Sequence, residues 1–236
     1  MNIAEKLTTI SQNEQKIYDK SRNDEYSSFW DSYQNSGNRT NYENAFAGAG
    51  WNDANFKPKH NMYPTSTYMM FRGTDIPEIY DKLDQLGITL DTNKCSVTQY
   101  MFYSTVSTTR IGTLDISNPL LTSLMFNSKI VTIDKLICSE RTVFSSSTFQ
   151  SINSLKNMIV EGTIAVSFSI TAASALSLES AKSIINALKD YSETDKEFAY
   201  SVSFHNNVWK KLDADGAAAP SGKTWREYIN SKCWNA

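Results

Sequence analysis

The residues that could carry out chemistry in this chain of 236 amino acids are few and scattered. Its two histidines, His60 and His205, have no neighbouring ligand motif, so neither predicts a metal site. Acid pairs such as Asp75 and Glu78 fit turns and solvated helix faces. No Gly-x-Ser-x-Gly elbow presents a nucleophilic serine. With no set of nucleophile, base and oxyanion stabiliser, we expect no enzyme, no cofactor and no metal.

One segment, from Gly216 to Thr224, is similar in composition to a phosphate-binding loop. A P-loop has four residues between its glycines, so that successive backbone amides wrap one phosphate. This segment has five, and it follows an expected helix rather than a buried strand. We interpret it as a loop that leads into a helix, whose first turn is closed by a capping box of Thr224 and Glu227.

The remaining candidate site is a set of polar and planar side chains beside the expected strands. They are Tyr103, Arg110, Lys129, Arg141 and Gln150, set in Ser/Thr/Asn-rich sequence. Aromatic and guanidinium groups supply much of the affinity where a protein binds a polymer or another protein. A plain solvated surface has the same composition, so both interpretations stay open.

These candidates lie on a pattern that occurs three times between Gln99 and Gly162. Each pass has a phenylalanine in turn-rich sequence, and these residues, Phe102, Phe126 and Phe149, are 24 and 23 residues apart. A short apolar strand follows, marked by Leu114/Ile116, Leu136/Cys138 and Met158/Val160, at a spacing of 22 residues. Such a period predicts a solenoid, in which each repeat buries its apolar face against its neighbours.

We expect three regions: a helix in residues 1–35, the solenoid in residues 36–170, and an α/β cap in residues 171–236. The first helix carries a narrow apolar seam of Ile3, Leu7, Ile10 and Ile17. The seam fits either an oligomerisation or docking helix or a helix that packs on its own domain. Within the array, turns at Phe46 and Phe71 precede an inserted helix, Pro77–Leu86, and a short strand, 88–90.

The C-terminal cap is predicted from three changes in the period of the hydrophobic pattern. Residues 177–191 have a helical pattern with Ala181, Ile184, Ile185 and Leu188 on one face. Tyr200, Val202 and Phe204 alternate as in a strand, and Val208, Trp209 and Leu212 return to helical spacing. Phe168 is expected to begin a degenerate fourth turn of the array.

Composition narrows the classes of partner. The formal charge of −2 gives no basic footprint for nucleic acid or for an acidic membrane. The three cysteines are scattered, without a Cys-x-x-Cys pair, so we expect neither a disulfide framework nor a zinc site. The first twenty residues carry charge throughout, and no membrane span occurs, so we expect no signal peptide and no membrane insertion.

The pass from Phe149 to Val160 resembles the BspA-type leucine-rich repeat, Phe-x-x-Cys-x-x-Leu-x-x-Ile-x-Ile. Phe149, Leu155, Met158 and Val160 occupy its apolar positions, and Ile152 replaces the usual cysteine. The Phe102 and Phe126 passes depart from it by short turn insertions. The resemblance covers about residues 41–169 and implies an irregular α/β leucine-rich-repeat solenoid with short parallel strands.

The chain as a whole resembles small repeat proteins encoded by Firmicutes and their prophages. The matching stretches are Ile3–Ile10, Phe29–Tyr33, Ala45–Gly48, Ser183–Tyr191 and Trp225–Asn230. The resemblance implies association with tail or baseplate gene clusters and recognition of bacterial surfaces. The expected function is thus a receptor-binding subunit of a phage tail or tail-like particle, which binds a cell-surface glycan or protein.

The expected partners follow from that function. The N-terminal helix would dock on tail or baseplate proteins, and the chain would form a homo-oligomer such as a trimer. The protein would be made in the cytoplasm, carried on the virion and exposed after lysis. The alternative is a BspA-like adhesin or interaction module outside any virion, which would predict a secretion signal or a wall anchor.

Overall fold

The computed structural model describes residues 40–41, 61–74, 79–85, 87, 89–118, 122–126, 129–194 and 198–236. The predicted seam of Ile3, Leu7, Ile10 and Ile17 and the turn at Phe46 lie outside these residues. In chain order the elements are β1 (Thr40–Asn41), β2 (Pro64–Ser66), α3 (Ile79–Gln85), β3 (Arg110–Asp115), β4 (Thr132–Cys138), β5 (Asn157–Gly162), β6 (Phe168–Ile170), α4 (Leu178–Ala187), β7 (Tyr200–Phe204), α5 (Asn206–Ala214), a 3-10 turn (Pro220–Gly222), α6 (Trp225–Ser231) and β8 (Trp234–Asn235).

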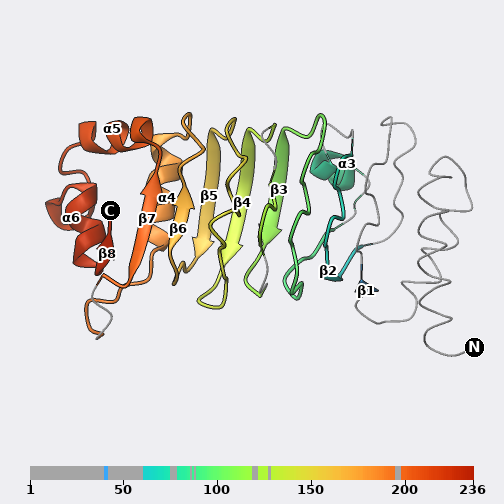
Figure 1. Ribbon diagram of the computed structural model, residues 1–236, viewed down its shortest axis with the longest axis horizontal. Helices are drawn as coiled ribbons and strands as arrows, with labels where there is room; N and C mark the ends of the chain where they lie inside the picture. Colours follow the sequence, from blue (N-terminus) through green and yellow to red (C-terminus); the bar gives the residue numbers. More distant parts are fainter. Residues whose placement is uncertain are drawn as a thin grey trace, which may run out of the picture.

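Every strand pair of these elements is parallel, and the strands follow one another in chain order. The sheets are β1-β2, β3-β4-β5 and β6-β7-β8. Figure 1 shows β3, β4 and β5, and then β6 and β7, following one another along the long axis of the molecule. Because neighbouring parallel strands point the same way, the chain makes one complete coil between each strand and the next. Such coils are what a solenoid would have, and assignment to the BspA-type class stays a prediction.

The phenylalanines that mark the passes form one buried column. Their ring centroids are 5.5 Å apart from Phe71 to Phe102, 6.4 Å from Phe102 to Phe126 and 5.2 Å from Phe126 to Phe149, with planes inclined by 19° or less. Phe168 continues the column at 5.0 Å from Phe149. It does so from strand β6, so the prediction that Phe168 begins a fourth turn is wrong.

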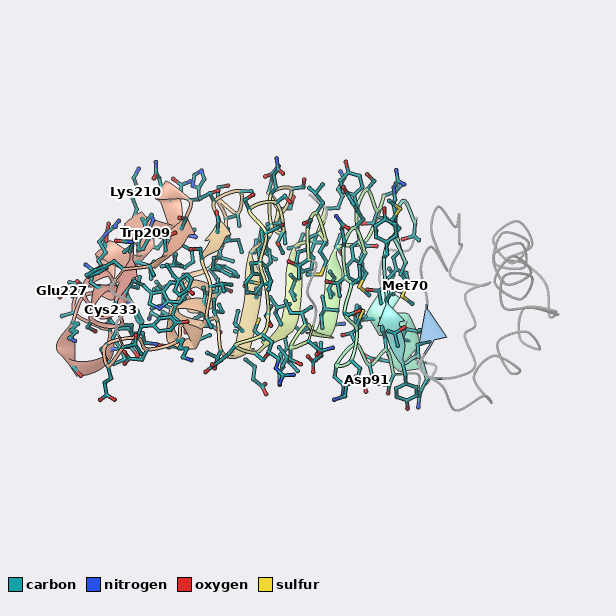
Figure 2. The ribbon with its side chains drawn as sticks, turned by 60° about the horizontal axis from the view of Figure 1, so that its bottom comes forward. Met70, Asp91, Trp209, Lys210, Glu227 and Cys233 are labelled. Carbon is teal, nitrogen blue, oxygen red and sulfur yellow. The ribbon has the colours of Figure 1, made fainter. Side chains whose placement is uncertain are left out.

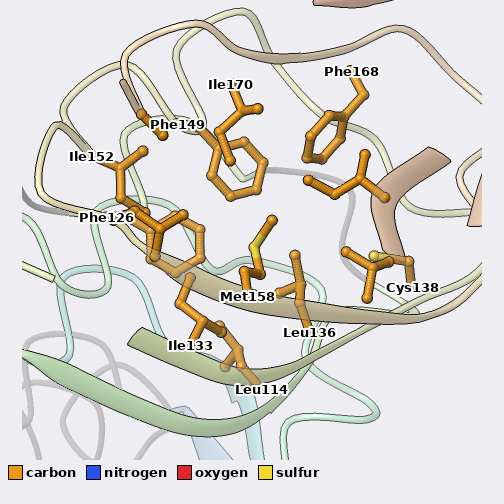
Figure 3. Packing of buried hydrophobic residues seen from close by; sticks show 14 of the residues in the cluster. Leu114, Phe126, Ile133, Leu136, Cys138, Phe149, Ile152, Met158, Phe168 and Ile170 are labelled. Atoms are coloured by element: carbon orange, nitrogen blue, oxygen red, sulfur yellow. The ribbon is translucent and has the colours of Figure 1, made fainter. Parts of the chain in front are cut away.

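Two rows of buried apolar residues cross the sheet β3-β4-β5 beneath this column (Figure 3). The rows are Ile111–Ile133–Met158 and Leu114–Leu136–Val160. Leu136 and Met158 are 22 residues apart but do not lie opposite each other. Strand β4 has one more residue between its two inward side chains than β5 has, so the register shifts there as in a β-bulge.

Helix α4 takes the place that a fourth strand would have beside β5. The hydroxyl of Ser180 accepts a hydrogen bond from Met158 N at 2.8 Å. That of Ser183 accepts from Val160 N at 2.8 Å and donates to Val160 O at 3.1 Å. The predicted helix is confirmed, but it ends at Ala187 rather than near residue 191, because the N–H of Leu188 caps the carbonyl of Ile185.

Helix α3 confirms the inserted helix over its described residues and packs on β3 at Gly112. A Cβ at Gly112 would lie 2.8 Å from Cδ1 of Tyr80, so this close approach requires glycine. Of the strand expected at residues 88–90, the described residues 89 and 90 form only one parallel bridge, between Leu90 and Met62. No helix in the described part of the chain is long and apolar enough to cross a membrane.

The C-terminal elements close the end of the molecule that lies away from α3 (Figure 1). The strand Tyr200–Phe204 and the capping box of Thr224 and Glu227 are confirmed. Lys232 is buried, and its Nζ donates to the carbonyl of Leu188 at 2.8 Å and to that of Asn186 at 3.2 Å. Thus the last turn of the chain holds the carbonyl end of α4.

Candidate functional site

The phenylalanine turns place equivalent residues side by side on successive coils. Two positions before Phe71, Phe102 and Phe126 stand Met69, Tyr100 and Leu124. The N–H of Met69 donates to Gln99 O at 3.1 Å, and that of Tyr100 donates to Ser123 O at 3.1 Å. We call Met69, Tyr100 and Leu124, together with Tyr68 and Tyr103, the turn ladder.

The backbone of the turn ladder adopts a conformation that its side chains disfavour. The φ angles are 55° at Met69, 58° at Tyr100 and 50° at Leu124. The left-handed region costs an L-residue roughly 1–2 kcal/mol, a cost that glycine avoids. Three bulky residues in this conformation on consecutive coils therefore indicate that their side chains have a role that glycine could not fill.

The tyrosines of the turn ladder form a half-buried cluster. Tyr100 contacts Tyr68 edge to face with ring centroids 5.9 Å apart, and Tyr103 likewise at 5.4 Å. No described residue forms a hydrogen bond with the hydroxyl of any of the three. The exposed guanidinium of Arg72 contacts another member of the turn ladder, with Nη1 3.4 Å from Sδ of Met69. The surface thus offers ring area, free hydroxyls and one cation.

Of the five predicted site residues, the structure places only two at equivalent positions on the same side of the molecule. Tyr103 and Gln150 occupy the same position, directly after Phe102 and Phe149, two coils apart on the turn side. The other three lie at the ends of strands. Arg110 begins β3, Lys129 precedes β4, and the exposed Arg141 follows the opposite end of β4.

Arg110 is engaged within the protein. Its guanidinium forms an ion pair with Asp81 of α3 and a two-point contact with Asp134 of β4, in which Nε lies 3.0 Å from Oδ1. A guanidinium bound by two carboxylates fixes α3 against the sheet. The five predicted residues therefore do not form one binding site.

Residue type alone does not single out Tyr68, Met69, Tyr100 and Leu124. A signal for them exists, because the sequence pairs methionine with the marker phenylalanine in Met70-Phe71, Met101-Phe102 and Met125-Phe126. The residue before each pair is the one with positive φ. The left-handed conformation itself leaves no trace in the sequence, since none of the three residues is glycine or asparagine.

The cysteine thiols and the carboxylate of Asp215 have structural rather than catalytic surroundings. Burial, followed by the charge of Asp115, raises the pKa of the Cys138 thiol to about 12, and burial also raises the pKa of Cys95. The pKa of Asp215 is lowered by hydrogen bonds from Trp225 and Lys182. In the part of the chain that the structure describes, no group of three or more metal-binding side chains could hold an ion.

The segment with the composition of a phosphate-binding loop has a different conformation. It contains the 3-10 turn Pro220–Gly222, with Ser221 at a φ of 63° inside it, and an antiparallel bridge between Ala219 and Lys223. The arrangement leads directly into α6, as expected for a loop and N-cap. The turn ladder is therefore the candidate that the geometry favours. No protein-family model, no curated protein and no solved structure matches this chain.

Proposed function

We propose that the chain is a non-enzymatic recognition protein whose turn ladder binds a bacterial cell-surface glycan or protein. The observation that carries this proposal is the run of three bulky residues with positive φ on consecutive coils, Met69, Tyr100 and Leu124. Strained backbone that is kept on an accessible, aromatic surface is typical of ligand-binding sites. Support for binding also comes from the hydroxyls of Tyr68 and Tyr103, which have no hydrogen bond with a described residue.

An extended polymer suits this surface better than a compact ligand does. Neighbouring coils repeat at about 4.8 Å, so equivalent side chains form a row rather than an enclosed pocket. Tyrosine rings pack against the C–H faces of sugars, while their hydroxyls and the Arg72 guanidinium exchange hydrogen bonds with sugar hydroxyls. Each contact of this kind is weak, and display of many copies raises the effective concentration.

The setting we propose is a phage tail or a tail-like particle, and it rests on the resemblance described above. In this proposal the N-terminal segment docks on tail or baseplate proteins, and several copies assemble. The protein is made in the cytoplasm and meets the cell surface after lysis. An adhesin outside any virion is the alternative.

Binding to isolated host cell walls tests the role of the turn ladder. Tyr100→Ala and Tyr103→Ala are each expected to weaken binding about tenfold, because central aromatic residues dominate such surfaces. Tyr63→Ala is the matched control, since Tyr63 is an exposed tyrosine outside the ladder. Equal binding by all three variants and the unaltered chain would remove the ladder from the proposal.

Two further measurements test the setting and the absence of catalysis. Copurification with tail particles after prophage induction is the expected result, whereas a protein found only as free monomer would refute the tail assignment. Release of soluble fragments from purified cell wall, proportional to time and protein concentration, would show that the chain is an enzyme.

A further inference from the structure

The acidic residues of the coils are kept away from the turns that carry the marker phenylalanines. The described residues of these turns are 67–74, 98–105, 122–126 and 145–152. None of the 25 acidic residues of the chain lies in them, and their one charged residue is Arg72. The described acidic residues of the same coils lie in α3, in or directly after the strands, and at Asp91. Figure 2 shows Asp91 at the lower margin of the molecule, well below Met70 of the Phe71 turn.

The register of the coils gives Arg72 a fixed place in the turn ladder. The N–H of Gly73 donates to Tyr103 O at 3.0 Å, so Arg72 and Tyr103 are neighbours on adjacent coils. The guanidinium of Arg72 is exposed, contacts Sδ of Met69 and forms no ion pair with a described residue. Its planar set of N–H donors is therefore open to a ligand that lies along the ladder.

The hydrogen-bonding groups of this surface favour a ligand that is rich in acceptors. A guanidinium only donates, whereas the hydroxyls of a neutral sugar also need acceptors, and carboxylates are the strongest acceptors among side chains. The turns offer no carboxylate, and their other polar side chains are hydroxyls and the amides of Gln99 and Gln150. Phosphate and carboxylate oxygens match a guanidinium in two-point contacts, and a surface without acidic residues does not repel them.

We infer that the polymer bound by the turn ladder is an anionic glycan. Its acidic groups contact the guanidinium of Arg72 and the hydroxyl of Tyr103, while its sugar rings pack on Tyr68 and Tyr100. This inference rests on the proposed function and names the class of its ligand. The acidic group is a carboxylate or a phosphate, because both present anionic oxygens to these donors. Since the contact is exposed, added salt weakens it.

Binding of the full chain to pairs of immobilised polymers that differ in charge tests the inference. Polygalacturonate carries carboxylates, and its methyl ester has the same backbone without the charge. Dextran phosphate and dextran form the corresponding pair for phosphate. By biolayer interferometry at low ionic strength, we expect at least one anionic polymer to bind roughly tenfold more tightly than its neutral partner. NaCl should reduce this difference, and the pair that shows it distinguishes a carboxylate from a phosphate ligand.

Arg72→Gln keeps a planar donor and removes the charge. It should weaken binding of the anionic polymer roughly tenfold and leave binding of the neutral partner unchanged. Arg141→Gln is the matched control, since Arg141 is an exposed arginine that follows β4, outside the turn ladder. Thermal melting establishes that each variant is folded before its binding is measured.

Three results would overturn the inference: equal binding of charged and neutral polymers, no binding of any of the four, or unchanged affinity in Arg72→Gln. The proposed function is judged separately, by the binding of Tyr100→Ala to cell walls. If this variant binds cell walls more weakly than the unaltered chain, the turn ladder remains a binding surface even where its ligand is not anionic.

Discussion

Ser183 and Val160 are joined by two hydrogen bonds through a single side-chain hydroxyl. The Oγ of Ser183 lies 2.8 Å from Val160 N and 3.1 Å from Val160 O. One hydroxyl on α4 thus acts as both the acceptor and the donor that a residue of a neighbouring strand would supply. Loss of this group leaves two backbone groups of β5 without their partner.

Ser183→Ala is accordingly expected to lower the free energy of unfolding by about 1–2 kcal/mol, since each lost hydrogen bond is worth about 1 kcal/mol. Urea denaturation followed by circular dichroism measures the change. Ser146→Ala is the control, because Ser146 is exposed and its side chain has no hydrogen bond with a described residue. A loss no larger than in the control would show that water replaces the serine without cost.

Phe126 stands in the middle of the phenylalanine column, with a stacked ring on each side. Phe126→Ala should lower the free energy of unfolding by about 3–5 kcal/mol, because it opens a cavity between two coils. Phe126→Leu should cost less, since it keeps most of the volume. Guanidinium denaturation provides the comparison, and a similar loss in the two variants would contradict a cavity effect.

Gly162 ends β5 at a φ of 91°, where a Cβ would collide with the carbonyl oxygen of Cys138. Gly162→Ala must therefore move the backbone of β4 as well as strain its own, and we expect a loss of at least about 3 kcal/mol. Gly216→Ala is the matched control. Gly216 has a φ of 66° and no atom within 4 Å of a built Cβ, so only strain of about 1 kcal/mol applies. Equal melting temperatures for the two variants would refute the collision.

Lys232 makes the free energy of unfolding depend on pH, and comparison with a variant that lacks its amine isolates this contribution. Burial lowers its pKa from 10.5, so the unfolded chain binds the proton more tightly than the folded protein does. The cost of the buried charge is present below the folded pKa and is relieved as the pH rises toward 10.5.

The unfolding free energy of the unaltered chain, taken relative to Lys232→Met, should therefore increase from about pH 7 to about pH 10. The raised pKa values of Tyr80 and Cys138 lower the stability of both proteins alike in alkaline solution, so they cancel in the difference. Denaturation at several pH values measures it. A difference that stays constant with pH would show that Lys232 titrates normally.

Identical residue types at a regular period made the phenylalanine column predictable. The markers Phe71, Phe102, Phe126 and Phe149 all lie in it. The strand register was less predictable, because an added residue in β4 changes which side chains face each other without changing their hydrophobicity. Spacing along the chain does not report such a shift.

The candidate sites show the same limit. From the sequence, Ser183 is expected on the polar face of a helix. Only its distance to Val160 shows that it pairs with the edge of a strand. Tyr100 carries no residue-type signal for its positive φ. Arg110 was recognised as a planar cation, but its partner Asp81 belongs to another element, and sequence spacing does not bring the two together.

The other edge of the sheet β3-β4-β5 is closed in the same way as the edge at Ser183. The hydroxyl of the buried Thr92 accepts a hydrogen bond from Asp115 N at 3.1 Å and donates to Asp115 O. At both edges a side-chain oxygen thus occupies a place that an invading strand would need. Because both places are filled, a strand from another copy of the protein cannot pair there. This sheet is therefore protected against the edge-to-edge association that starts amyloid growth.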